Sequence, residues 1–285
     1  MREIAPTPSL PPALARAVAD EQQRFSGVLA MWVHDLRRHE TYGLRADDPT
    51  EPASAIKLFV LLELFRQAEV GALTLDEVIE VRERDMVDGS GVLKDLTPGL
   101  KLTLRDAATL MITVSDNVAA NVLIARLGVG AINRGARAAG ATCTHLGVSL
   151  LRRRQGASYS TPRDLGWLLT RIARRTAVSP AASREMLDIL GRERIDNIVG
   201  RLLPDTGPDG RPLRRSWRVA SKNGSVRGVR NDVALVRGNG LSYVVILMSR
   251  DCRDLRYSPD NEATLCLARI ARAVHDHVTR PCDSS

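Results

Sequence analysis

The chain has 285 residues, 44% of them hydrophobic, which is enough for one large domain or two closely joined lobes with a full core. Its net charge is +8, but only 4% of the residues are aromatic and the arginines are scattered among acids, which argues against nucleic-acid binding. No apolar run approaches the roughly 18 residues of a membrane span, and residues 1–23 lack the apolar core of a secretion signal. We expect a cytoplasmic protein, or a secreted one if a leader was removed, that does not bind membranes and is a monomer or weak dimer.

The first part of the chain predicts a helix, a hairpin and a buried helix. Residues 11–23 have apolar side chains at helical spacing, and 28–33 and 40–44 have the pattern of two paired strands. Residues 54–69 are almost entirely apolar, as in a helix that is buried on all sides. Ser54 lies at the start of this helix.

The middle of the chain, residues 101–200, reads as a series of helices. Helix-start signals occur at Thr103, Asp116 and Thr161, the last followed by Pro162 at the first helical position. Three strands are then predicted at 217–221, 232–236 and 242–248, and a last helix at 261–278.

Strands near both ends of the chain, on either side of a helical middle, predict an α+β fold. We expect an antiparallel sheet, flanked by the terminal helices, with an inserted all-helical lobe. In this division residues 1–50 and 205–285 form the sheet lobe, and residues 51–204 form the helical lobe.

The cysteines and histidines give no sign of a metal or redox centre. The cysteines, Cys143, Cys252, Cys266 and Cys282, include no C-x-x-C pair, and no histidine lies in a metalloprotease frame. We expect free thiols, no metal and no cofactor.

Three short motifs follow one another in fixed order, namely Ser54-Ala55-Ile56-Lys57, Ser115-Asp116-Asn117 and Lys222-Asn223-Gly224. Each is weak alone, but this order and spacing match the motif set of serine acyl-transfer enzymes. The chain resembles the class A β-lactamase and penicillin-recognising serine enzyme family over roughly residues 25 to 275. The segments 71–76, 89–93, 111–117 and 228–233 are similar to that family as well.

Lysine is rare in this chain. Only four of the 41 basic residues are lysines, and two of them, Lys57 and Lys222, stand at motif positions. An amine can lose its proton or act as a point charge, whereas a guanidinium stays protonated. The composition therefore supports a chemical role for both lysines.

The residues of the first motif fit nucleophilic catalysis. Ser54 needs a base to attack a carbonyl, and Lys57 lies three residues later, on the same helix face. The alternative is that Lys57 is a structural lysine at the edge of the core. The Ser54 amide, at a helix start, can form half of an oxyanion hole.

The resemblance implies the remaining roles. The second oxyanion donor would be the amide of Ser225, and Ser115 would relay a proton between Lys222 and the leaving nitrogen; its alternative role is a helix N-cap. Asn117 would hold Lys57 and the amide side chain of the substrate. Lys222 would attract a substrate carboxylate, unless residues 221–225 form only a hairpin turn. Further substrate contacts are expected at four residues, namely Asn223, Gly224, Arg227 and Arg230.

The chain departs from the family at two places. Asn223 replaces the usual Thr or Ser, which removes a hydroxyl from the expected carboxylate site. Residues 141–160 contain no acidic residue, although the family's β-lactamases carry there the Glu that activates the deacylating water. Glu185 and Glu193 lie beyond the next helix, in a different one. A deacylating base would then be Lys57, Tyr159 or His145, or another nucleophile would accept the acyl group.

These features predict a serine hydrolase of the β-lactamase type that opens a β-lactam, or a related amide or ester, through an acyl-Ser54 intermediate and deacylates slowly. Its partner would be a small-molecule substrate with a carboxylate and an amide or ester. One alternative is an intracellular acyltransferase, amidase or esterase of peptide or natural-product metabolism. Another is a non-catalytic penicillin-binding-like module, in which Ser54 could be replaced without loss.

Overall fold

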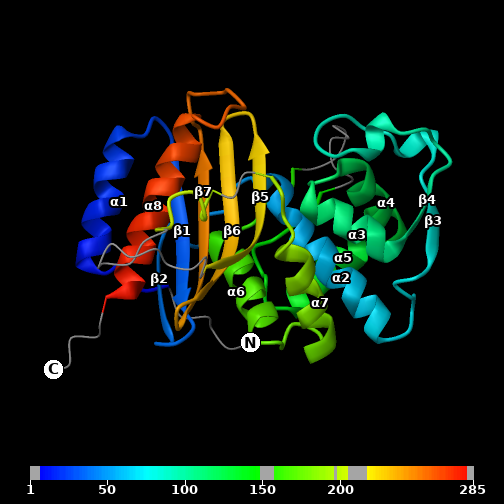
Figure 1. Cartoon of the computed structure of the whole chain (residues 1–285), viewed down its shortest axis with the longest axis horizontal. Helices are drawn as coiled ribbons and strands as arrows, with labels where there is room; N and C mark the ends of the chain where they lie inside the picture. The colour runs from blue at the N-terminus through cyan, green and yellow to red at the C-terminus, as the bar shows by residue number, and fades with distance from the viewer. Residues whose placement is uncertain (1–6, 148–156, 196–197, 205–216, 281–285) are drawn as a thin grey trace.

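The protein, described here as a computed structural model, combines an antiparallel sheet with a helical lobe (Figure 1). The structure describes residues 7–147, 157–195, 198–204 and 217–280. None of the described helices is long and apolar enough to cross a membrane. The α+β fold expected from the sequence is confirmed.

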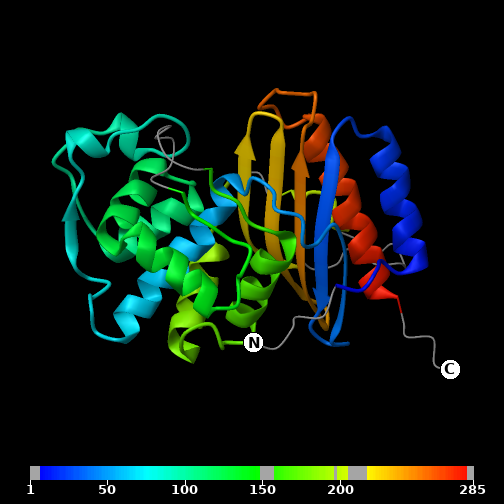
Figure 2. The same cartoon turned by 180° about the vertical axis from the view of Figure 1, so that it is seen from behind.

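The sheet has five strands in the order β2-β1-β7-β6-β5, and every neighbouring pair is antiparallel. The strands are β1 (Val28–Asp35), β2 (Glu40–Leu44), β5 (Arg218–Val226), β6 (Val229–Gly238) and β7 (Leu241–Arg250). All five were predicted, with shorter bounds for four of them. The order makes β5 an edge strand, next to the helical lobe (Figure 2).

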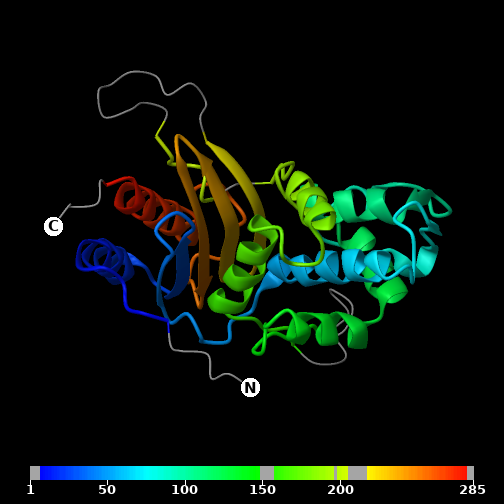
Figure 3. The ribbon, with the colours of Figure 1, turned by 90° about the horizontal axis from the view of Figure 1, so that it is seen from below.

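The terminal helices α1 (Pro12–Arg24) and α8 (Glu262–Thr279) pack together on one face of the sheet (Figure 3). The other helices are α2 (Lys57–Glu69), α3 (Leu104–Thr113), α4 (Asn117–Leu127), α5 (Val129–Ala138), α6 (Pro162–Ala173) and α7 (Pro180–Leu190). A separate two-stranded sheet pairs β3 (Val78–Glu80) with β4 (Lys101–Thr103), so the expectation that residues 51–204 form an all-helical lobe is wrong at this point.

The helix starts predicted at Thr103, Asp116 and Thr161 are confirmed by their capping contacts. In each case the side chain of the capping residue accepts a hydrogen bond from the backbone N–H three residues later. The donors are Asp106 for Thr103, Ala119 for Asp116 and Asp164 for Thr161. These side chains satisfy backbone donors that a helix start leaves unpaired.

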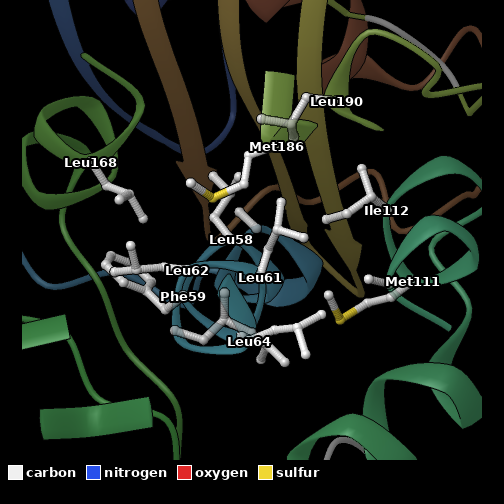
Figure 4. Packing of buried hydrophobic residues seen from close by; sticks show 14 of the residues in the cluster. Leu58, Phe59, Leu61, Leu62, Leu64, Met111, Ile112, Leu168, Met186 and Leu190 are labelled. Atoms are coloured by element: carbon white, nitrogen blue, oxygen red, sulfur yellow. The ribbon is translucent and has the colours of Figure 1, made fainter. Parts of the chain in front are cut away.

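Two hydrophobic clusters lie on the two faces of the sheet. Strand β7 alternates between them, with Val244, Ile246 and Met248 on the helical-lobe side and Tyr243 and Val245 on the α1/α8 side. On the lobe side, α2 is surrounded by apolar side chains from α3, α6 and α7 (Figure 4). The predicted all-round burial of this helix is confirmed.

Helix α6 belongs to the segment assigned to the helical lobe, yet it packs directly on the sheet against β1, β6 and β7. The close approach depends on Gly166, because any Cβ there would overlap the ring of Trp32 on β1. The helical segment thus also supplies the second cover of the sheet, and the division into two lobes stays a prediction.

Candidate active site

Ser54 and Lys57 lie where the chain enters the buried helix α2. Ser54 lies in a short 3₁₀ turn, Ala53–Ile56, and is half-buried. Lys57 is the first residue of α2, and it is fully buried. Apolar side chains before and after Lys57 anchor the helix in the core. The chain therefore places an amine in the interior, three residues after the half-buried Ser54.

The Ser115-Asp116-Asn117 motif forms the link between α3 and α4. Asp116, not Ser115, is the N-cap of α4, so the alternative role considered for Ser115 is wrong. Asp116 also accepts from the backbone of Val92 and Leu93, at 2.7 and 2.9 Å, and so fixes the 89–93 loop beside the turn. Ser115 itself has a φ of 53°, a left-handed conformation that is uncommon for residues other than glycine.

The amine of Lys57 is held by the second motif. Its Nζ lies 2.6 Å from the Ser115 carbonyl, 3.1 Å from Ser115 Oγ and 2.9 Å from Asn117 Oδ1. Asn117 also donates through Nδ2 to the carbonyl of Asp88, at 3.2 Å. The structure thus brings together Lys57, Ser115 and Asn117, and Asn117 orients the lysine as expected.

The surroundings of Lys57 favour its neutral form. Burial, and then the positive charge of Lys222, lower the pKa of Lys57 well below 10.5, while Asp116 and Glu193 oppose the shift. A neutral amine can still donate to the Ser115 carbonyl and to Asn117, and it has a lone pair for a hydroxyl proton. These surroundings are compatible with a role of Lys57 as a base.

The Lys222-Asn223-Gly224 motif lies inside strand β5, so the alternative of a hairpin turn at residues 221–225 is wrong. The turn between β5 and β6 falls at Arg227 and Gly228 instead. Gly224 packs against the Ser54 turn, where a Cβ would lie 2.5 Å from the Pro52 carbonyl and 3.1 Å from the Ser54 nitrogen. Glycine at this position lets the strand pass directly beside the proposed nucleophile.

The register of β5 makes two of its backbone N–H groups point to the free edge of the sheet, away from β6. Val226 and Val229 are opposite each other at a two-residue turn and form a hydrogen-bonded pair, so Asn223 and Ser225 are in non-hydrogen-bonded pairs. Their N–H groups point to the free edge, and that of Asn223 donates there to Glu193 Oε1, at 2.9 Å. The amide of Ser225 points to the same edge, which suits an oxyanion donor.

Glu193 is the site residue that the sequence reasoning missed. It lies in the loop after α7, not in a helix, and the side chain is 3% exposed. Its Oε1 accepts from Lys222 Nζ at 2.9 Å, and its Oε2 from Ser221 Oγ at 2.6 Å. No motif marks this residue, because the contact joins segments about thirty residues apart.

Lys222 is consequently not the free cation that the resemblance implied. Its ammonium contacts Glu193 at 2.9 Å and both the carbonyl and Oδ1 of Asn223, at 3.0 and 2.9 Å. The lysine side chain has no exposed surface. The carboxylate of Glu193 and the two oxygens of Asn223 together accept all three hydrogens of the ammonium.

Arg230 does not fit the substrate-binding role expected for it. The side chain is buried, and Nη1 donates to the carbonyls of Val226 and Val229, at 2.8 and 2.7 Å. Nη2 donates to the carbonyl of Arg256. The guanidinium is thus committed to holding the β5–β6 turn and the loop beyond β7, whereas Arg227 is exposed at the turn.

His145 and Tyr159, the aromatic candidates for a deacylating base, form a pair of their own. Their backbones exchange hydrogen bonds of 2.9 and 3.0 Å, and their rings stack at 5.5 Å. Within the described residues, neither ring is hydrogen-bonded to Ser54 or Lys57. Residues 148–156 of the acid-free stretch lie outside the described residues.

The fold, and the grouping of Lys57, Ser115 and Asn117 beside the Ser54 turn, define a protein of the serine β-lactamase-like class. The chain belongs to the Beta-lactamase enzyme family, which matches residues 13–278. It is 25% identical to a β-lactamase of Rhodobacter capsulatus over 268 residues, covering 92% of this chain and 88% of that one.

The solved structures agree. A β-lactamase from Sphaerobacter thermophilus superimposes with a TM-score of 0.84 at 26% identity, covering 94% of this chain and 97% of that chain. A mutant of PBP-A, solved as an acyl-enzyme complex with penicillin G, has a TM-score of 0.83 at 23% identity, with 96% and 99% covered. At that identity the second match shows a shared fold only.

Proposed function

We propose that the protein is a serine hydrolase that opens a β-lactam, or a related amide or ester, through an acyl-Ser54 intermediate. The observation that carries the proposal is the buried amine of Lys57, hydrogen-bonded to Ser115 and Asn117, one turn from Ser54. Such an arrangement supplies a base for the nucleophile and a second hydroxyl for the leaving group.

In the proposed reaction Ser54 Oγ attacks the substrate carbonyl as its proton passes to Lys57. The amides of Ser54 and Ser225 stabilise the oxyanion, and they are donors that need no reorganisation. When the carbon–nitrogen or carbon–oxygen bond breaks, the proton reaches the leaving atom through Ser115. Water then cleaves the acyl ester and restores the free Ser54 hydroxyl.

The remaining hydrogen of Asn117 Nδ2 is available for a substrate carbonyl, because Asp88 takes one of the two. The second oxyanion donor is supported by the register of β5, which turns the Ser225 amide outward at the edge that touches the Ser54 turn. Both roles belong to the proposal and share its test.

We expect acylation to rise with pH and to level off well below pH 10.5, the ordinary pKa of lysine. The reason is that Lys57 accepts a proton only when neutral, and burial and Lys222 lower its pKa. The rate constant of fluorophosphonate labelling of Ser54, measured from about pH 5 to 10, checks this. A rate that still climbs in proportion to hydroxide at the top of that range would mean that Lys57 is not the base.

A further inference from the structure

We infer that the subsite expected to bind a substrate carboxylate is electrically neutralised by Glu193, so that the enzyme accepts acyl donors with uncharged leaving groups at least as well as those with a carboxylate. This inference rests on the proposed acyl-Ser54 reaction. It concerns the substrate class rather than the chemistry of the nucleophile.

The first support is the geometry of the Lys222–Glu193 pair. The two side chains are 0% and 3% exposed, so water screens neither charge, and their nitrogen and oxygen lie 2.9 Å apart. The negative charge of Glu193 therefore offsets part of the attraction that Lys222 exerts on a third charge nearby. A substrate carboxylate would meet a dipole instead of a cation.

The second support is the hydrogen-bond inventory. All three hydrogens of the Lys222 ammonium are used within the protein, on Glu193, the Asn223 carbonyl and Asn223 Oδ1. A carboxylate could gain a hydrogen bond from Lys222 only by displacing one of these partners. Displacement would leave a buried acceptor unsatisfied, which costs binding free energy.

The third support is that three donors hold the carboxylate of Glu193 in place. Its oxygens accept from the Lys222 ammonium, the Asn223 amide and the Ser221 hydroxyl, at 2.9, 2.9 and 2.6 Å. These three hydrogen bonds fix the carboxylate beside the amine of Lys222. The negative charge that offsets Lys222 is therefore a fixed part of the site.

A second buried carboxyl lies close to the pair and adds no positive charge. Asp232 is fully buried, accepts from the Val199 amide at 2.9 Å, and leaves Oδ1 without a partner. Burial, and then the charge of Glu193, raise the pKa of Asp232 to about 7. When ionised, Asp232 adds a second negative charge to the region, and when neutral it adds no charge.

Among the described residues, the arginines near β5 do not replace the charge that Lys222 loses. Arg230 is bound to backbone carbonyls of the β5–β6 turn and of the loop beyond β7. Arg227 and Arg194 are exposed, and charges surrounded by water and salt attract an anion only weakly.

The experiment uses two phenylacetate esters, whose leaving groups are 3-hydroxybenzoate and the uncharged 3-hydroxybenzamide. For each ester, the kcat/KM for phenol release is divided by the rate constant for hydrolysis of the same ester by hydroxide. This division corrects for the different intrinsic reactivities of the two leaving groups. We expect the carboxylate-to-amide ratio of the wild-type protein to be no greater than about three.

The variant Glu193→Gln should raise this ratio at least fivefold, because it uncovers the charge of Lys222. Glutamine keeps the shape of the side chain, with Oε1 as acceptor and Nε2 as donor to Ser221. Glu185→Gln is the matched control, since it removes an acid of α7 that pairs with Arg105 instead, and it should leave the ratio unchanged.

A wild-type ratio above three, or a rise below fivefold in folded Glu193→Gln, would overturn the inference. If Glu193→Gln does not fold, the wild-type ratio decides alone. Fluorophosphonate labelling of Ser54 distinguishes a failure of the neutral-subsite inference from a failure of the proposed function. Labelling without hydrolysis of the neutral ester contradicts the neutral subsite, whereas no labelling and no ester hydrolysis contradicts the proposed function itself.

Discussion

Lys57→Arg is expected to lower the rate of Ser54 acylation by about 10²- to 10⁴-fold, the range that loss of a general base produces. Arginine keeps the positive charge but cannot give up its proton at any accessible pH. In the wild-type protein the amine is buried among Ser115 and Asn117, where its pKa is lowered well below 10.5. The labelling rate constant of a fluorophosphonate measures the loss.

Two controls keep this result interpretable. Lys57→Met fills the same buried space without charge and should lose activity to a similar degree, while circular dichroism and thermal unfolding report whether each variant folds. Lys94→Arg, at an exposed position outside the site, should label at the wild-type rate. If folded Lys57→Arg acylates as fast as the wild type, Lys57 is structural.

With a penicillin at saturating concentration, we expect a burst of one acylation per enzyme, followed by slow turnover and accumulation of acyl-Ser54. The reason is the acid-free stretch 141–160, which provides no carboxylate base for the deacylating water. The loss of one general base raises a barrier by about 3 to 5 kcal/mol, enough to make deacylation limit the cycle. Rapid mixing with intact-mass detection follows the acyl-enzyme directly.

Steady turnover above about 100 s⁻¹ with no burst would contradict this expectation and show that another group activates water. Tyr159→Phe and His145→Asn would then be the first variants to test, because these residues lie at the ends of the acid-free stretch. Their rings stack on each other, so each variant needs a check of folding.

The sequence predicted the elements that local chemistry determines. The starts of α3, α4 and α6 follow from capping residues such as Thr103 and Thr161, whose contacts lie within the same turn of chain. Ser54 and Lys57 were found because their spacing is fixed by a single helix. That one antiparallel sheet is built from both ends of the chain followed from the pattern of strands on either side of a helical middle, whereas the order of the strands did not.

The parts that could not be predicted depend on contacts between distant segments. Glu193 carries no local signature and meets Lys222 only because the loop after α7 folds against β5. Arg230 looked like a substrate contact until its carbonyl partners were known. The packing of α6 on the sheet depends on Gly166 facing Trp32, a pair separated by more than a hundred residues.

The covalent role of Ser54 is tested most directly by peptide-level mass spectrometry after incubation with a fluorophosphonate or a reactive β-lactam. We predict one adduct per chain, on the peptide that contains Ser54, and no adduct at this peptide in Ser54→Ala. An adduct of the same stoichiometry retained by Ser54→Ala, or placed on another residue in the wild type, would contradict the account.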